Sequence, residues 1–365
     1  MLTRYVLVED YDKSRYEVDL PLTLSIDYAK IRQELGIPEY VDTTSLLLER
    51  GLVTIWAARN AATLDTKFQN ADQLRIKKEP IPLLFFGGGA VKLLCPEAND
   101  PSNPLCREIN DIDLVTSKKR GADLVALLLA LHTFCGTRYY HFTTRSDTRF
   151  NALRGGKRYR LRAIDKILSD SLQTGVLDIL VDRINLRHKV EFGEALADSA
   201  GNMYTIGLER ILLSKCQYIF DIPNTLSASD HEKVEHQLLS YPYYRSDRLL
   251  IGMEEKDIKD ICAVFLSHDV GEGNGLVNPK LIRTVLEGDT KFTLTFRLNL
   301  ENILRNEQYL KNMKLSNHDV SLILSRVEAT LEAIPRVDKK WSNPWWNEDI
   351  ETPVIFGKTN VAGNG

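Results

Sequence analysis

The sequence lacks the features that mark several large classes of protein. Its five cysteines form no Cys-x-x-Cys pair, and its seven histidines form no His-Glu-x-x-His motif. A disulfide scaffold and a zinc site are therefore not indicated. No apolar run approaches the roughly 20 residues that a membrane-spanning helix needs, and acids stand where a signal peptide has its apolar segment. These absences predict a cytoplasmic protein without membrane contact.

An excess of positive charge is also missing, since 47 Lys and Arg stand against 50 Asp and Glu, for a net charge of −3. No overall basic character therefore indicates a nucleic-acid partner, and any anionic partner must be bound by a local patch. The 365 residues are 43% hydrophobic and 27% charged, which are ordinary globular values. The chain is long enough for two or three domains with a sizeable core.

The spacing of apolar residues changes along the chain. Residues 1–80 predict an α-rich N-terminal region, residues 81–203 alternate between strand and helix patterns, and residues 204–335 keep to helical spacing. The tail, residues 336–365, contains three tryptophans and no periodicity, so we expect it to be extended or disordered. The predicted fold class is α/β (α+β): a mixed sheet with flanking helices, followed by a helical C-terminal domain.

The strongest signal for chemistry is a glycine-rich turn that precedes a pair of aspartates. The buried strand pattern IPLLFF ends at Gly87, Gly88 and Gly89, and helical spacing follows. Such a turn lets backbone amides approach a phosphate at a helix N-terminus. Asp111 and Asp113 then lie two residues apart on a predicted strand, so their carboxylates share one face. Two carboxylates this close repel each other unless a cation lies between them. The pair therefore predicts a hard divalent cation, which would bind both carboxylates and the phosphates of a substrate.

A third carboxylate occurs in the strand pattern VLDILVD, where Asp178 and Asp182 share a face. Aspartates inside a strand are disfavoured, so a buried one needs a compensating partner. We expect Asp178 to be the third metal ligand because its neighbours on both sides are apolar. In the alternative interpretation, Asp182 lies at the strand end and is solvated or paired with Arg183 or Arg187.

These motifs together resemble the nucleotidyltransferase superfamily with the DNA polymerase β-like palm. GGGAVKLL, then Arg107 with DIDLV, then LDILVD follow the order of that family's glycine turn, Asp-x-Asp pair and later aspartate. The match is closer to the branch related to abortive-infection (AbiE-type) toxins and to uncharacterised prokaryotic members, and it covers about residues 81–270. The sequence departs in two respects: Gly89 stands where relatives often carry Ser or Thr, and a loop lengthens the spacing to the aspartate pair.

The resemblance implies a reaction, which is transfer of a nucleoside monophosphate from a nucleoside triphosphate to an acceptor hydroxyl with release of pyrophosphate. Asp111, Asp113 and Asp178 would bind Mg²⁺ or Mn²⁺ and carry catalysis, and Gly87–Gly89 would cradle the triphosphate. The likeness to AbiE-type toxins makes a tRNA or other RNA 3′ end the first expected acceptor. It also implies a cognate antitoxin as a partner.

Two positively charged residues complete the expected nucleotide site. The resemblance implies that Lys215, on a later helix, counters phosphate charge, and we expect Arg154 to do the same. The family's acidic pair on the next helix would correspond to Asp257 or Asp260, which could partner Lys215 or line the site. A purely structural role is the alternative for these residues: Lys215 could extend to the surface, and the acids could be exposed.

Residues 145–166 form the most basic segment, with eight Lys and Arg against two Asp. We expect a hairpin that turns at Gly155 and Gly156. Its charge could hold a triphosphate or an RNA backbone. The alternative is a solvated hairpin without a partner.

Two other functions fit the same residues. A protein that keeps the fold without catalysis would sense nucleotides or bind RNA, and its acids would be residual. A structural or interaction protein would use the acids and the basic segment only to pair with each other. The first predicts nucleotide binding without turnover. The second predicts no stabilisation by a nucleoside triphosphate, because only a ligand that binds the native state raises its stability.

Overall fold

The computed structural model describes most of the chain in separate stretches, which are residues 43–59, 81–117, 120–125, 127–128, 139–165, 174–185, 188–193, 204–217, 220–221, 243–246, 249–253 and 255–337. The predicted tail from residue 338 onward and the chain before residue 43 lie outside these residues. The described residues belong to two compact units that interleave along the sequence. The first unit draws on segments 1–89, 108–183 and 192–206, and the second on segments 90–107, 184–191 and 207–365.

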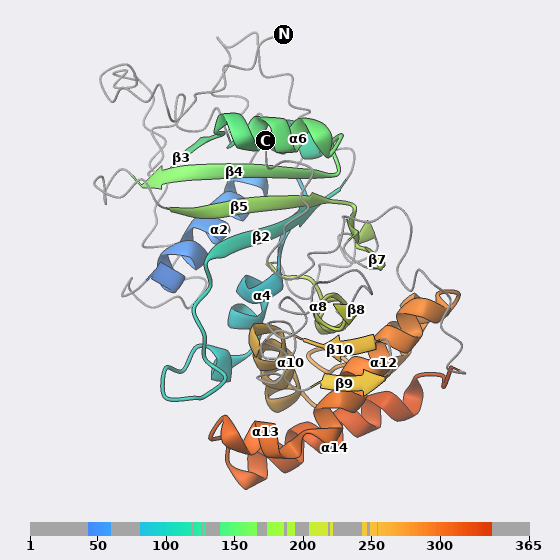
Figure 1. Ribbon diagram of the computed structural model, residues 1–365. Coiled ribbons are helices and arrows are strands. Elements are labelled where there is room, and N and C mark those ends of the chain that lie inside the picture. The colour runs from blue at the N-terminus through green and yellow to red at the C-terminus, as the bar shows by residue number, and fades with distance from the viewer. Residues whose placement is uncertain are drawn as a thin grey trace, which may run out of the picture. The chain divides into compact units, whose positions relative to one another are not determined.

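A five-stranded mixed sheet forms the centre of the first unit (Figure 1). Its strands are β1 (Leu83–Phe86), β2 (Asp111–Thr116), β3 (Tyr139–Phe142), β4 (Arg158–Asp165) and β5 (Thr174–Val181). They lie in the order β1-β2-β5-β4-β3. Only the central pair, β2 and β5, is parallel, and the other neighbours are antiparallel. The predicted mixed sheet with flanking helices is therefore confirmed.

Helix α2 (Thr43–Arg59) covers one face of this sheet, where it packs against β1 and β2 (Figure 1). The ring of Phe85 fits closely beneath it, because a Cβ atom at Gly51 would lie 2.1 Å from that ring. The absence of a side chain at Gly89 also leaves space for this ring, since a Cβ atom there would lie 2.7 Å from Phe85. Phe85 is the register partner of Leu114, so the covered face is the one that carries Leu114. The neighbouring Asp113 belongs to the opposite face.

The predicted hairpin in the basic segment is wrong, because its first part is helix α6 (Arg145–Leu153). A capping box starts this helix: the Thr144 hydroxyl accepts a hydrogen bond from the Asp147 amide, and the Asp147 carboxylate accepts one from the Thr144 amide. Such reciprocal bonds satisfy backbone donors that a helix otherwise leaves unpaired. Gly155 and Gly156, both with positive φ, follow the helix and turn the chain into β4.

Replacing Thr144 by alanine is expected to lower the free energy of unfolding by about 1 kcal/mol, since the first turn of α6 loses its capping acceptor. Ser146→Ala is the matched control, because Ser146 is exposed in the same helix, and we expect it to cost less than about 0.5 kcal/mol. Urea unfolding followed by circular dichroism measures both. Equal losses in the two variants would contradict the capping argument.

Helices make up most of what the structure describes of the second unit, as predicted for the C-terminal region. They are α8 (Leu208–Lys215), α10 (Glu255–Ser267), α11 (Pro279–Leu286), α12 (Thr290–Arg305), α13 (Glu307–Asn312) and α14 (Asn317–Ala333). Their core contains the fully buried rings of Phe265, Phe292 and Phe296. A small sheet in the order β8-β10-β9 was not predicted; it consists of β8 (Phe220–Asp221), β9 (Tyr243–Ser246) and β10 (Leu249–Gly252).

Three short elements complete the description: a two-stranded sheet of β6 (Arg183–Asn185) and β7 (Lys189–Glu191), and the 3₁₀ helix η3 (Pro96–Ala98). Within the second unit, η3 packs against α10, and β7 packs against α8. Across the described part of the chain, no helix combines the length and the apolar character needed to span a bilayer.

Candidate functional site

The glycine-rich turn lies where the sequence predicts it, between β1 and helix α4 (Gly87–Leu94). Gly87 has a φ of 63°, and a Cβ atom there would lie 2.6 Å from Oδ2 of Asp113. A residue with a side chain would therefore be strained in its backbone and would displace the carboxylate. Gly88 and Gly89 complete the first turn of α4. The turn and the second aspartate of the pair are thus in direct proximity.

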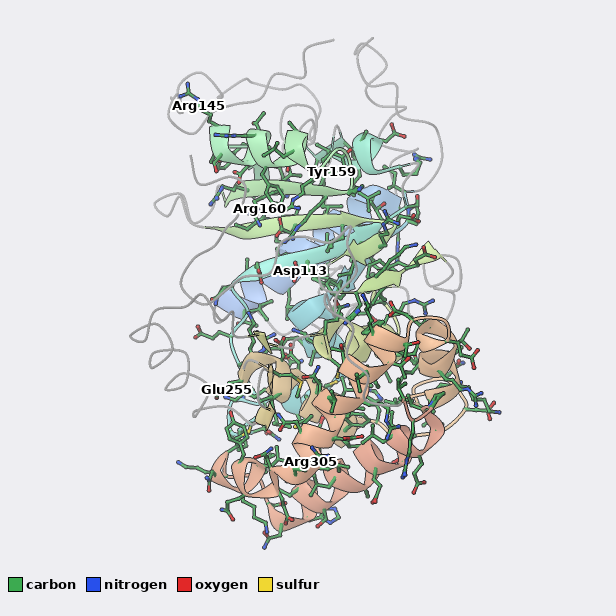
Figure 2. All side chains as sticks on the ribbon, turned by 45° about the vertical axis from the view of Figure 1, so that its right-hand side comes forward. Asp113, Arg145, Tyr159, Arg160, Glu255 and Arg305 are labelled. Atoms are coloured by element: carbon green, nitrogen blue, oxygen red, sulfur yellow. The ribbon has the colours of Figure 1, made fainter. Side chains whose placement is uncertain are left out.

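The three predicted acids share one face of the sheet. Asp113 is the register partner of Asp178 across the parallel strands β2 and β5, and Asp111 is the partner of Val176. Residues paired in this way, and residues two apart on one strand, point to the same side. Asp111 is exposed, Asp113 is half-buried and Asp178 is buried. Figure 2 labels Asp113 on β2. The register places it on the face opposite to the one that α2 covers.

Two arginines of β4 bind the Asp178 carboxylate. Arg160 contacts both oxygens, with its Nε 2.9 Å from Oδ1 and its Nη2 3.0 Å from Oδ2. Arg158 donates from Nη2 to Oδ2 at 2.5 Å. A two-pronged contact between guanidinium and carboxylate fixes geometry as well as charge. The compensating partner that a buried strand aspartate requires is therefore supplied by arginine.

Burial and charge act on Asp178 in opposite directions. Burial would raise the pKa of its carboxyl group, but Arg158 and Arg160 outweigh burial and lower it. The pKa of Arg160 is raised, chiefly by its hydrogen bonds to Asp178. Asp178 and Arg160 are therefore ionised at neutral pH.

Helix α6 holds these arginines from the other side. The ring of Phe150 lies beneath three guanidinium groups, with centroid distances of 4.4 Å to Arg160, 5.1 Å to Arg154 and 5.6 Å to Arg158. Asn151 accepts a hydrogen bond from the backbone amide of Arg160 at 2.6 Å and donates to its carbonyl at 3.0 Å. Stacking on the ring and the clamp on the backbone together limit the freedom of the arginine side chains. We call Arg154, Arg158, Arg160 and Phe150 the arginine cluster.

The other charged residues of the basic segment differ in their exposure. Arg162 pairs with the buried Asp147 at 2.8 Å, as Arg158 and Arg160 pair with Asp178. Arg145, Arg149 and Lys157 are exposed on α6 and on the turn after it. Figure 2 shows Arg145 at the start of α6, directed away from the sheet. Lys166 lies outside the described residues.

Lys215 belongs to the second unit, where it forms a buried ion cluster. Its Nζ lies 2.8 Å from Oδ1 of Asp257 and 2.8 Å from Oδ2 of Asp260. Arg107 also binds Asp260 through two contacts of 2.8 and 2.6 Å. The Lys215 side chain is only 11% exposed. Of the alternatives, the structure shows Lys215 paired with both aspartates, and the alternative of exposed acids is wrong because Asp257 and Asp260 are buried. A contact between Lys215 and a triphosphate stays a prediction.

The same cluster shifts the pKa of each of its central members. Burial would lower the pKa of Lys215, but Asp257 and Asp260 raise it well above its usual value. Burial would raise the pKa of Asp260, but Lys215 and Arg107 lower it. For Asp257, burial outweighs the contact with Lys215 and the pKa is raised. Lys215 is therefore held as an ammonium ion in the protein interior.

The acids fit a metal ion unequally. Among the residues that the structure describes, no three His, Cys, Asp or Glu side chains come together in a group that could hold a metal. Asp111 and Asp113 nevertheless suit Mg²⁺, which binds proteins through one or two carboxylates and takes its other ligands from substrate phosphates and water. Asp178 suits it less well, because both of its oxygens already face guanidinium groups. The catalytic roles of the three acids stay predictions.

Sequence reasoning offers pairing between the acids and the basic segment only as an alternative, and it does not single out Arg158 and Arg160 as the partners of Asp178. It predicts a hairpin that is solvated or holds a triphosphate or an RNA backbone, and it gives Phe150 and Asn151 no role. The available signal was the alternation of arginine with apolar or aromatic residues in RYRLR, which places successive arginines on one face of a strand. A buried acid on a neighbouring strand is the natural partner of such a row.

Comparison with known proteins adds no family assignment. No model of a known protein family matches the chain, and a search of curated proteins finds no significantly similar sequence.

Proposed function

We propose that this protein is a metal-dependent nucleotidyltransferase, which moves a nucleoside monophosphate from a nucleoside triphosphate to an acceptor hydroxyl. The observation that carries the proposal is the contact between the glycine turn and the aspartate pair: Gly87 has room for no side chain because the Asp113 carboxylate lies against it. A phosphate-binding turn and a metal-binding pair are useful together only if one ligand contacts both. A nucleoside triphosphate with a bound divalent ion is such a ligand.

Asp111 and Asp113 would hold Mg²⁺ or Mn²⁺, and the bound ion would supply Lewis-acid stabilisation of the negative charge that develops on the transferred phosphoryl group. The backbone amides at the start of α4 would donate hydrogen bonds to phosphate oxygens, and the helix dipole favours the negative charge of these oxygens. Arg158 and Arg160 of the arginine cluster provide positive charge on the same sheet, next to Asp178. Positioning and electrostatics of this kind dominate phosphoryl-type transfer.

RNA is the acceptor that the surface of the first unit favours. Arg145, Arg149 and Lys157 are exposed along α6 and its following turn, and a row of exposed cations binds a phosphate backbone without sequence preference. An RNA 3′ end, that of tRNA first, offers the hydroxyl that the reaction needs. Because the sequence resembles AbiE-type proteins, the proposal includes a toxin-like role and a cognate antitoxin as a partner.

Incubation with each α-labelled nucleoside triphosphate, Mg²⁺ or Mn²⁺, and total RNA tests the proposal. We expect the label to appear in RNA with the wild-type protein and to vanish in the variant Asp111→Asn/Asp113→Asn, since both metal-binding carboxylates are then lost. Asp123→Asn is a control, because Asp123 is an acid of the same unit that pairs with Arg120. If the label appears on the protein itself, the acceptor is a protein hydroxyl and not RNA. No label in either, with every nucleotide, would contradict RNA and protein as acceptors.

One observation favours a second function, that of a nucleotide sensor: the Asp178 carboxylate is bound by arginine side chains. If transfer needs Asp178 for metal binding, the protein would bind a nucleotide without turning it over and would act as a sensor. Thermal unfolding with ATP and Mg²⁺ separates this function from a purely structural role, because a ligand that binds the native state raises the melting temperature. A shift without label transfer supports the sensor, and no shift supports the structural role.

A further inference from the structure

The Asp178 carboxylate has little remaining capacity for a metal ion. It accepts three hydrogen bonds from guanidinium groups, two from Arg160 and one from Arg158. An ionised carboxylate offers about four such sites in all. The bond network therefore uses most of the lone pairs that a metal ligand would donate.

Electrostatics oppose a metal at the same carboxylate. A divalent cation bound to Asp178 would face two guanidinium cations on the same oxygens, and like charges at hydrogen-bonding range repel strongly where burial limits screening. Asp178 is only 3% exposed, so water gives this site little screening. Asp113, the register partner on β2, is half-buried, and Asp111 is exposed.

The arginines are held in place by contacts that do not involve Asp178. Asn151 binds both backbone groups of Arg160, and Phe150 stacks beneath the guanidinium groups. A salt bridge between mobile side chains exchanges easily, but here α6 holds the arginines independently of Asp178, through Phe150 and Asn151. The neighbouring residues thus fix the positions of the charged groups in this ion pair.

We infer that Asp178 is not a metal ligand but a positioning residue, which fixes Arg158 and Arg160 beside the Asp111–Asp113 pair. The site then binds its metal through two carboxylates, and the two guanidinium groups provide the positive charge that a second metal would otherwise bring to a nucleotide's phosphates. The inference rests on the proposed function for the identity of the metal-binding pair. It differs from the ligand set that the family resemblance implies.

Mn²⁺ binding to the full-length protein, without nucleotide or RNA, tests the ligand set directly through the electron paramagnetic resonance signal of free Mn²⁺. We expect Asp113→Asn to weaken binding about tenfold or more, as loss of a metal-site residue typically does, and Asp178→Asn to change it by less than about twofold. Arg160→Gln removes two of the three bonds to Asp178 and should tighten Mn²⁺ binding, because Asp178 becomes accessible to the ion. That gain should disappear in Arg160→Gln/Asp178→Asn.

Two results would overturn the inference: weakening by Asp178→Asn as large as that by Asp113→Asn, or an unchanged Mn²⁺ affinity in Arg160→Gln. If Asp178→Asn fails to fold by near-ultraviolet circular dichroism, the Arg160→Gln result still decides. The titration contains no substrate, so it identifies the ligands of the ion even when the transfer assay yields no product. Failure of the proposed reaction and failure of this inference are therefore separate outcomes.

Discussion

Replacing Lys215 by methionine is expected to lower the free energy of unfolding by about 3–5 kcal/mol, the usual cost of removing one partner from a buried ion pair. The substitution leaves Asp257 and Asp260 buried without the ammonium group that contacts both. Lys280→Met is the matched control in the same unit, because Lys280 pairs with Glu272 while both side chains are well exposed. Exposed pairs contribute only about 0–1 kcal/mol.

Urea unfolding as a function of pH tests the origin of this loss. The pKa of Lys215 is raised, so its contribution is fully present below the ordinary lysine pKa of about 10.4 and is lost only at higher pH. The pKa of Asp260 is lowered, so its contribution is present above about pH 4 and is lost as the pH falls. The difference in the free energy of unfolding between wild type and Lys215→Met should therefore be largest around neutral pH and should become smaller below pH 4. A loss as small as that of Lys280→Met would refute the buried-cluster explanation.

Replacing Gly87 by alanine is expected to reduce nucleotidyl transfer by about a hundredfold, because a misplacement of about 1 Å at a reacting group has an effect of that order. The new Cβ would lie 2.6 Å from Oδ2 of Asp113, so the carboxylate must move. The backbone adds a cost of about 1–2 kcal/mol in stability, since a left-handed conformation is unfavourable for alanine.

Gly155→Ala separates the two effects of that substitution. Gly155 has a φ of 54°, close to that of Gly87, but nothing lies within 4 Å of its Cβ position. We expect both variants to lose similar stability and only Gly87→Ala to lose transfer and Mn²⁺ binding. Equal activities in the two variants would show that the contact between the turn and Asp113 is not needed for the reaction.

Local patterns were enough to predict the parts of the site that depend on one or two consecutive elements. The apolar run before Gly87 indicates a buried strand and the spacing after it a helix, and both form at those residues. Asp111 and Asp113 share a face because side chains alternate along any strand. The mixed α/β class and the helical C-terminal region follow from the same periodicities. In each case the signal lies within a few residues of the feature it predicts.

The pairing of charges depended on the tertiary structure. Asp178 meets Arg160 because β4 lies antiparallel beside β5 in one particular register, and a shift of one residue would turn those arginines to the other face. The helical form of residues 145–153, by contrast, has a local signal, because Thr144 and Asp147 form a capping box at the start of the helix. Asp260 meets Lys215 and Arg107 across long sequence separations. The sequence by itself determined which residues carry charge and which elements hold them; only the fold decided which charges neutralise each other, because strand register and helix packing set distances that local spacing does not encode.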